Sequence, residues 1–186
     1  AKQDKFNPIP AISKRLHTKV EQNLKRLEEY SESSPLNYVE WGEKKIGIIS
    51  SGVAYEYAKE VYGENASYLK LGFTFPLPMR KIREFAARVD QLIVVEELEP
   101  IMENEIKAAG IPCIGKEKIP CEGELNPDIL RQSLLGEEHE TIRYDVSVVA
   151  ARPPVLCAGC PHRGFFYELQ KMKNVITVSD IGCYGL

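Results

Sequence analysis

Three of the five cysteines lie close to the end of the sequence, and their spacing makes them the first candidates for chemistry. Two residues separate Cys157 from Cys160, His162 follows, and Cys183 comes directly after residues 180–182, which read Asp-Ile-Gly. Thiolates and imidazoles are metal ligands, and glycine lets a backbone approach a ligand closely. The spacing therefore predicts either a metal site or a loop that lies against a cofactor.

The Cys-x-x-Cys pair has several readings that spacing alone does not separate. A thioredoxin-like redox pair needs a strand-to-helix turn inside a complete β-α-β unit, whereas this pair follows a linker. A c-type haem needs a histidine directly after the second cysteine, and Pro161 stands there instead. Zinc needs four ligands; Cys157, Cys160, His162 and Cys183 could supply them, although Cys160 and His162 are closer together than usual. An iron–sulfur cluster needs four thiolates, and this stretch has three. Spacing alone therefore supports structural thiols beside a cofactor as well as it supports metal ligands.

Composition excludes several classes of protein. The 186 residues carry a formal net charge of -3, with 44% hydrophobic and 27% charged residues, as in an ordinary globular protein. No basic block is present, which argues against nucleic acid as the main partner. No apolar run approaches the roughly 18 residues of a membrane span. An odd cysteine count without a signal peptide indicates reduced thiols in the cytoplasm.

The first 39 residues are expected to form a helix and a linker. Apolar residues recur at spacings of three and four and make one stripe of an amphipathic helix. The stripe consists of Ile12, Leu16, Val20, Leu24, Leu27 and Tyr30. We expect this stripe to pack on its own domain rather than on a neighbouring one, and Pro35 to end the helix region.

Residues 40–150 are predicted to form a three-layer α/β/α domain with a mostly parallel sheet. Short apolar runs alternate with helical patterns, and such crossovers place helices on both faces of a parallel sheet. The expected strands are 44–50, 67–73, 92–95 and 111–114, with helices at 53–63, 79–89, 101–109 and 127–136, and residues 146–149 read as extended. Glu96, Glu97 and Glu99 follow the clearest strand, where α/β proteins bind ligands, but capping of the next helix is the better interpretation.

Residues 151–186 resemble the opening of a further domain. A helical pattern at 164–171 is followed by the strand-like run Val175, Ile176 and Val178. The sequence begins with Ala1 and breaks off within a cysteine motif, so we expect a piece of a longer polypeptide. An isolated strand cannot satisfy its own backbone, and we expect this tail to self-associate with a second copy.

The tail carries a family resemblance. The strings CAGCPHRGFFYEL and VSDIGCYGL closely resemble the alpha subunit of indolepyruvate ferredoxin oxidoreductases, with Ala158 where that family usually has proline. Upstream, GIISSGVAYEYAKE, LKLGFTFPLP and VVEELEPIMENEIK are similar to the same subunit. The resemblance covers nearly the whole chain and is most specific in the tail.

The resemblance implies a thiamine-diphosphate-dependent 2-oxoacid:ferredoxin oxidoreductase. Such enzymes decarboxylate arylpyruvates oxidatively, form the acyl-CoA, and reduce ferredoxin through iron–sulfur clusters; a beta subunit is the implied partner. Residues 40–150 would be the transketolase C-terminal-like domain and residues 151–186 the truncated start of the thiamine-diphosphate-binding domain. The alternative is a non-catalytic α/β scaffold that docks partner domains or subunits.

The family's cofactor contacts can be carried over to particular residues of this sequence. Thiamine diphosphate would lie against Asp180, Ile181, Gly182 and Cys183, with His162 nearby. Cys157, Cys160 and Cys183 would be iron–sulfur ligands, with a fourth cysteine further downstream. No catalytic residue is assigned, because the ylid-generating carboxylate belongs to another domain and no magnesium-binding Gly-Asp segment precedes Leu186. We therefore expect the chain alone to be inactive and to bind no cofactor.

Overall fold

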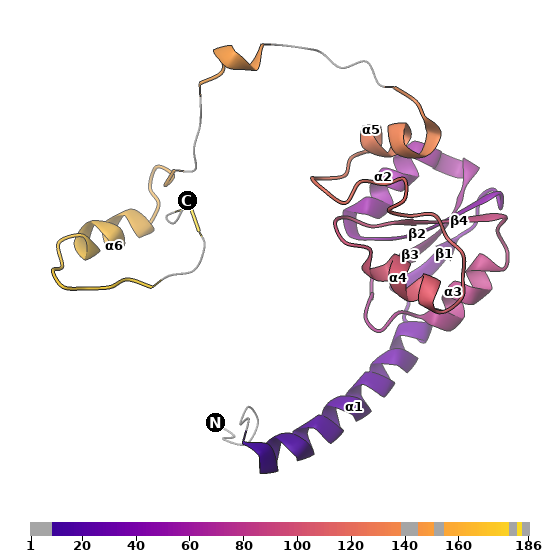
Figure 1. The fold of residues 1–186 in the computed structure, drawn as a ribbon, viewed down its shortest axis with the longest axis horizontal. Helices are drawn as coiled ribbons and strands as arrows, with labels where there is room; N and C mark the ends of the chain where they lie inside the picture. The colour runs from indigo at the N-terminus through magenta and orange to yellow at the C-terminus, as the bar shows by residue number, and fades with distance from the viewer. Residues whose placement is uncertain (1–8, 139–144, 151–154, 179–181, 184–186) are drawn as a thin grey trace. The chain divides into compact units, whose positions relative to one another are not determined.

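The computed structural model describes residues 9–138, 145–150, 155–178 and 182–183. The chain consists of two compact units, Ala1–Glu140 and Thr141–Leu186 (Figure 1). Within the described residues, no helix is both long enough and apolar enough to cross a membrane.

The first unit is built on a four-stranded sheet. Its strands are β1 (Asn37–Glu40), β2 (Ile46–Ser51), β3 (Ser67–Leu71) and β4 (Gln91–Val95), in the order β1-β3-β2-β4. β2 pairs in parallel with both β3 and β4, and β1 pairs antiparallel with β3. Ile114 adds a single parallel bridge to Ile93 beyond β4. The predicted mostly parallel sheet is confirmed, while the expected strand at 111–114 is reduced to this bridge.

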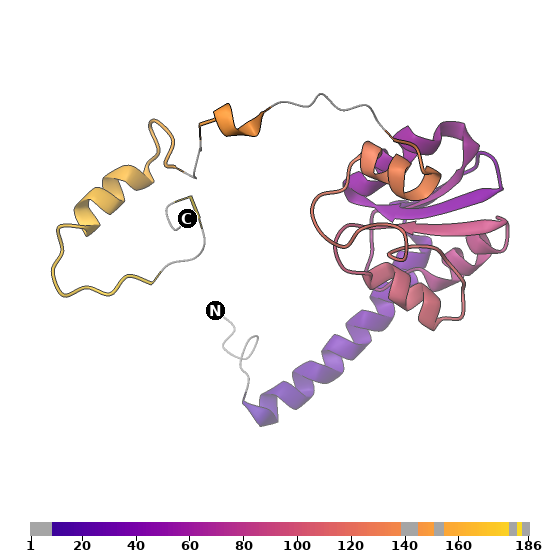
Figure 2. The ribbon, with the colours of Figure 1, turned by 45° about the horizontal axis from the view of Figure 1, so that its top comes forward.

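Helices cover both faces of the sheet (Figure 2). The helical segments of the unit's body are α2 (Gly52–Tyr62), η2 (Gly63–Asn65), α3 (Met79–Ala86), α4 (Ile101–Ala108), α5 (Pro127–Leu130) and the π-helical turn η3 (Arg131–Leu135). Ile48 and Ile93 pack in one core with α2 and α5. The neighbouring residues Ile49 and Val94 point to the other face and pack with α3 and α4. This alternation of side chains along each strand produces the predicted three layers.

α1 (Pro10–Ser33) differs from its prediction. Most of its apolar stripe does not pack on its own domain: Val20 and Leu27 are exposed, and Ser31 is the helix's one buried residue. Only the last turn is anchored, where the Tyr30 ring meets Phe73 edge-on with centroids 5.4 Å apart. Figures 1 and 2 show the rest of α1 extending away from the α/β layers.

The join between α1 and the sheet depends on Asn37, the first residue of β1. This side chain is 1% exposed; its amide donates to the carbonyls of Ser31 and Phe73, both at 3.0 Å, and its carbonyl accepts from the Phe73 N–H. The Glu32 carboxylate accepts the N–H groups of Arg80 and Lys81 at the start of α3. β1 was not predicted from the sequence.

The second unit contains η4 (Val146–Val148), a 3-10 turn, and α6 (His162–Leu169). The expected extended segment at 146–149 is therefore a helical turn. The strand expected at 175–178 is wrong as well: these residues have no strand partner among the described residues, and Ile176 is 92% exposed. No described residue beyond 140 is buried. Self-association of the tail stays a prediction, now without a strand to mediate it.

Replacing Asn37 by aspartate should destabilise the first unit by about 2–3 kcal/mol, because the lost amide leaves two buried carbonyls without a donor. Urea unfolding of the 186-residue chain measures this. Asn104→Asp, on the exposed side of α4, is the control and should stay within about 0.5 kcal/mol of the parent. Equal stability of the two variants would contradict the anchoring role of Asn37.

Candidate functional site

A cavity of about 480 Å³ lies at the carboxyl ends of β2 and β4. β2 continues into α2 on one face of the sheet, and β4 continues into α4 on the other face. The two strand-to-helix connections therefore diverge at this edge. α/β proteins bind ligands at such a switch point. Ser51, Phe75, Glu96, Ile101 and Met102 are among the lining residues.

One wall of the cavity is fixed by the Glu96 side chain, which is 8% exposed. Its two oxygens accept the N–H groups of Met102 and Glu103, both at 2.9 Å, and thereby cap the start of α4. Carboxylates at a helix N-terminus are favoured by its unpaired N–H groups and its dipole. The predicted capping role is confirmed for Glu96, and it gives this carboxylate a structural use inside the cavity wall.

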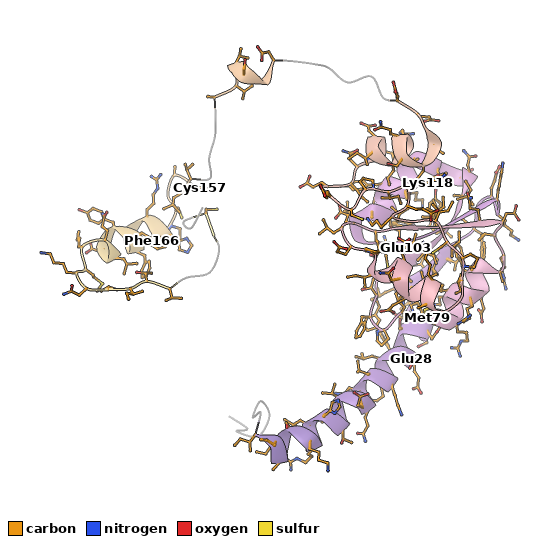
Figure 3. All side chains as sticks on the ribbon, viewed as in Figure 1. Glu28, Met79, Glu103, Lys118, Cys157 and Phe166 are labelled. Carbon is orange, nitrogen blue, oxygen red and sulfur yellow. The ribbon has the colours of Figure 1, made fainter. Side chains whose placement is uncertain are left out.

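Glu103 continues the same network within the first turn of α4 (Figure 3). Its buried carboxylate accepts the Lys116 N–H at 2.8 Å and the Lys107 ammonium at 2.6 Å. The Lys116 ammonium in turn donates to the backbone oxygen of Glu96 at 2.5 Å. Glu96, Glu103 and Lys116 thus form a closed ring, called here the edge ring, that joins β4, α4 and the following loop.

The geometry of the edge ring requires a glycine at position 115. A Cβ added there would lie 2.2 Å from Oε2 of Glu103. Burial alone would raise the pKa of Glu103, but the hydrogen bonds from Lys107 and Lys116 and their positive charges hold it below its ordinary value of 4.5. Glu103 is therefore ionised at neutral pH, as the ring needs.

The rim of the cavity is apolar and acidic. Val53, Phe75, Leu98 and Ile101 are exposed by 48%, 63%, 59% and 68% respectively. Leu98 has a positive φ of 55°, which is costly for a residue with a branched side chain. The exposed carboxylates of Glu97 and Glu105 line the cavity. Leu98 and the exposed Glu99 do not line it but lie in the loop that joins the lining residues Glu97 and Ile101.

The residues that line this cavity determine which groups it can accept. Among the described residues that line it there is no lysine, arginine, histidine or cysteine. Both carboxylate oxygens of Glu96 accept N–H groups of α4, and Glu97 accepts the Leu125 N–H at 3.2 Å. Carboxylates that face a cavity repel anions. The site therefore favours apolar groups that are neutral or positively charged.

A second polar cluster joins β1 to α2. The Glu40 carboxylate accepts from the Tyr55 hydroxyl and the Lys59 ammonium. The hydrogen bonds from Lys59 and Tyr55 lower the pKa of Glu40, whereas burial and the hydrogen bond to Glu40 raise the pKa of Tyr55 to about 12. The hydrogen bonds to Glu40 and Tyr55 also raise the pKa of Lys59. None of these groups exchanges a proton near neutral pH, so the cluster fastens β1 rather than performing acid–base work.

The sequence-predicted site residues lie in the second unit. The Cys160 N–H donates to the Cys157 carbonyl at 3.1 Å, so the Cys-x-x-Cys pair forms a turn, and Cys160 Sγ lies 3.5 Å from His162 Nδ1. Cys183 instead lines a separate hollow of about 900 Å³ beside α6. Asp180 and Ile181 lie outside the described residues, and Gly182 is half-buried.

The described residues do not bring the predicted ligands together. No three His, Cys, Asp or Glu side chains of the described part of the chain are close enough to hold a metal ion. Burial raises the pKa of the Cys113 thiol to about 11, so this thiol is not activated. This is consistent with the structural role predicted for Cys113. Sequence reasoning did not identify Glu103 or Phe75; the glycine at 115 was the one local signal for the Glu103 contact.

We predict that Glu103→Gln costs about 1–3 kcal/mol at neutral pH, the range for a buried charged hydrogen bond. A group whose pKa is lowered by folding stabilises the fold above its unfolded value of 4.5 and loses that contribution as the pH falls through the folded pKa. The difference between parent and variant should therefore shrink on acidification. Urea unfolding across pH tests this, with Glu105→Gln on the exposed side of α4 as control. A pH-independent difference would show that the charge of Glu103 is not involved.

The chain is similar to several known proteins. Residues 39–117 match the indolepyruvate oxidoreductase domain. Indolepyruvate oxidoreductase subunit IorA of Methanothermobacter thermautotrophicus is 35% identical over 98% of the chain, which covers 34% of that subunit. The corresponding subunit of Thermococcus kodakarensis is 30% identical over 98% of the chain and is covered to 32%.

A solved structure is also similar in part. The 2-oxoglutarate:ferredoxin oxidoreductase of Magnetococcus marinus, with 2-oxoglutarate, coenzyme A and succinyl-CoA bound, matches 59% of the chain and 20% of its own, with 21% identity and a TM-score of 0.45. The chain spans about one third of the length of the IorA subunits that it matches.

Proposed function

We propose that this chain is part of a thiamine-diphosphate-dependent 2-oxoacid:ferredoxin oxidoreductase that acts on arylpyruvates such as indolepyruvate. The reaction is oxidative decarboxylation to the acyl-CoA and CO2, with the two electrons passed to ferredoxin. The observation that carries this proposal is the match to IorA subunits across 98% of the chain, including the cysteine-rich tail. The beta subunit, ferredoxin, CoA and the arylpyruvate are the proposed partners and substrates.

We assign the residues of this chain to two domains of that enzyme. Residues 40–150 are assigned to a transketolase C-terminal-like domain, and the α/β layers with their own core support this. Residues 151–186 are assigned to the start of the thiamine-diphosphate-binding domain. The absence of any buried residue in its described part supports a segment that depends on further protein for its core.

Thiamine diphosphate is assigned to the loop of Asp180, Ile181, Gly182 and Cys183, with His162 as a neighbouring contact. Bound there, the cofactor would supply an ylid that attacks the 2-oxo carbon. The carboxylate that activates the aminopyrimidine would come from another domain of the enzyme. This chain thus contributes one side of the cofactor site and no step of the chemistry.

Cys157, Cys160 and Cys183 are assigned as ligands of an iron–sulfur cluster. Their donor chemistry suits a cluster, but three thiolates are one short of the usual four, and the described residues do not bring all three together. The residues of this chain alone therefore do not make a complete site, and a further cysteine from the longer protein is required.

The first test uses the whole subunit assembled with its partner. Cys157→Ser and Cys183→Ser should each remove at least one cluster's iron and lower indolepyruvate-dependent reduction of ferredoxin by tenfold or more. The control Cys121→Ser, exposed in the first unit, should leave both unchanged. Full iron content in the Cys157 and Cys183 variants would overturn the ligand assignment. Absence of indolepyruvate oxidation by the intact enzyme would overturn the proposed activity.

The second test uses the 186-residue chain alone. It should bind thiamine diphosphate with a dissociation constant above roughly 1 mM, even with magnesium, because it supplies only part of the cofactor's contacts. It should also leave indolepyruvate unreacted. Isothermal titration calorimetry measures the binding, with the whole enzyme as positive control. Micromolar binding by the isolated chain would mean that the complete cofactor site lies within these residues.

A further inference from the structure

α1 presents an apolar stripe that its own unit covers only in part: Val20 is exposed, while Ile12 and Leu16 are half-buried. A helix of 24 residues is about 36 Å long, and its anchored part is the last turn alone, at Tyr30, Ser31 and Glu32. Ile12, Leu16 and Val20 lie on one side of the remaining length at helical spacing. Such i, i+4, i+8 anchors are how an amphipathic helix enters an apolar groove.

Charge divides α1 along its length. Residues 10–26 carry one acidic residue, Glu21, while the last turns carry Glu28, Glu29 and Glu32. The basic residues of 10–26 are Lys14, Arg15, Lys19, Lys25 and Arg26. The uncovered part of the helix therefore combines an apolar stripe with a strong excess of positive charge.

The cavity at the carboxyl edge has the opposite character. Its rim exposes Phe75 and Ile101, and the carboxylates around it, such as Glu99 and Glu105, are exposed as well. No lysine or arginine is among the described residues that line it. The N-terminal part of α1 and the rim of the cavity are thus both apolar and are opposite in charge.

α1 cannot fill the cavity of its own chain. Tyr30 packs on Phe73, in the loop that also contributes Thr74 and Phe75 to the cavity, so the helix starts from the same edge and runs away from it. Residues 11–33 contain no glycine or proline, the usual causes of a sharp kink. The basic, apolar part of α1 is therefore held clear of its own edge.

We propose that two copies of this chain associate reciprocally, each placing the N-terminal part of α1 in the carboxyl-edge cavity of the other. The two edges face each other, and each helix crosses to the opposite body while its last turn stays on its own. Such an arrangement is isologous and closes at two copies. It goes beyond the proposed oxidoreductase activity and does not depend on it.

Charge reversal tests the arrangement in the 186-residue chain. Lys14→Glu with Lys19→Glu reverses the helix surface, and Glu99→Lys with Glu105→Lys reverses the cavity rim. Each double variant should weaken dimerisation by tenfold or more in sedimentation velocity, with unchanged circular dichroism. The matched controls are Lys45→Glu with Lys118→Glu and Glu122→Lys with Glu124→Lys, which change the charge equally at exposed positions elsewhere and should leave the dimer intact.

Mixing the two double variants gives the decisive result. A reversed helix meets a reversed rim in one half of the mixed dimer, and the two parental surfaces meet in the other, so mixing should restore dimers that neither variant forms alone. A chain ending at Glu138 should dimerise like the parent, because every buried residue in the described part of the chain lies between Ser31 and Leu130.

Several outcomes would overturn the proposal. A parent chain that stays monomeric at high concentration excludes it. Dimers that survive rim reversal but not helix reversal would mean that α1 pairs with α1. Dimers that are lost on truncation at Glu138 would assign the association to the tail instead.

Discussion

The first unit depends on the burial of two carboxylates at the end of β4. An ionised carboxylate taken out of water costs several kcal/mol unless its oxygens are paired. In the edge ring every such oxygen has a donor: Glu96 takes two N–H groups of α4, and Glu103 takes an N–H of the next loop and the Lys107 ammonium. Because the donors come from α4 and from the following loop, and two of them hold Glu96 at the end of β4, none of these three segments can shift without leaving a buried charge unpaired.

The edge ring determines what the adjoining cavity can accept. It fixes α4 so that Ile101 is turned to solvent while Met102 is buried, and it uses Glu96 for structure. The rim that results is apolar and negatively charged, a poor environment for a 2-oxoacid or a diphosphate, both of which are anions. This edge is therefore better suited to contacts between protein surfaces than to anionic ligands.

The sequence predicts those elements whose signals are local. Four consecutive apolar residues from Leu92 predict β4 correctly, and helical periodicity predicts α1. Periodicity shows which face of a helix is apolar but not what packs against that face. The expectation that α1 packs on its own domain was therefore wrong. β1 was missed because Asn37 is buried through bonds to Ser31 and Phe73, of which Phe73 is remote in sequence. Residues 175–178 have strand-forming side chains, yet a strand forms only where a partner is available.

The same reasoning separates the site residues that could be predicted from those that could not. Cys157 and Cys160 stand out in the sequence because their spacing is itself the signal. Glu103 has no such signal, since a glutamate within a helix is usually solvated; its burial follows from a contact with residues twelve and more positions away. The cysteine pair, by contrast, has no buried residue around it in the described tail. A recognisable motif thus lies in a segment without its own core, while the well-packed unit carries its functional surface in residues that no motif identifies. This division is expected where an α/β domain serves to position its neighbours: its core can be complete within one chain, but its binding surfaces acquire their partners only on assembly.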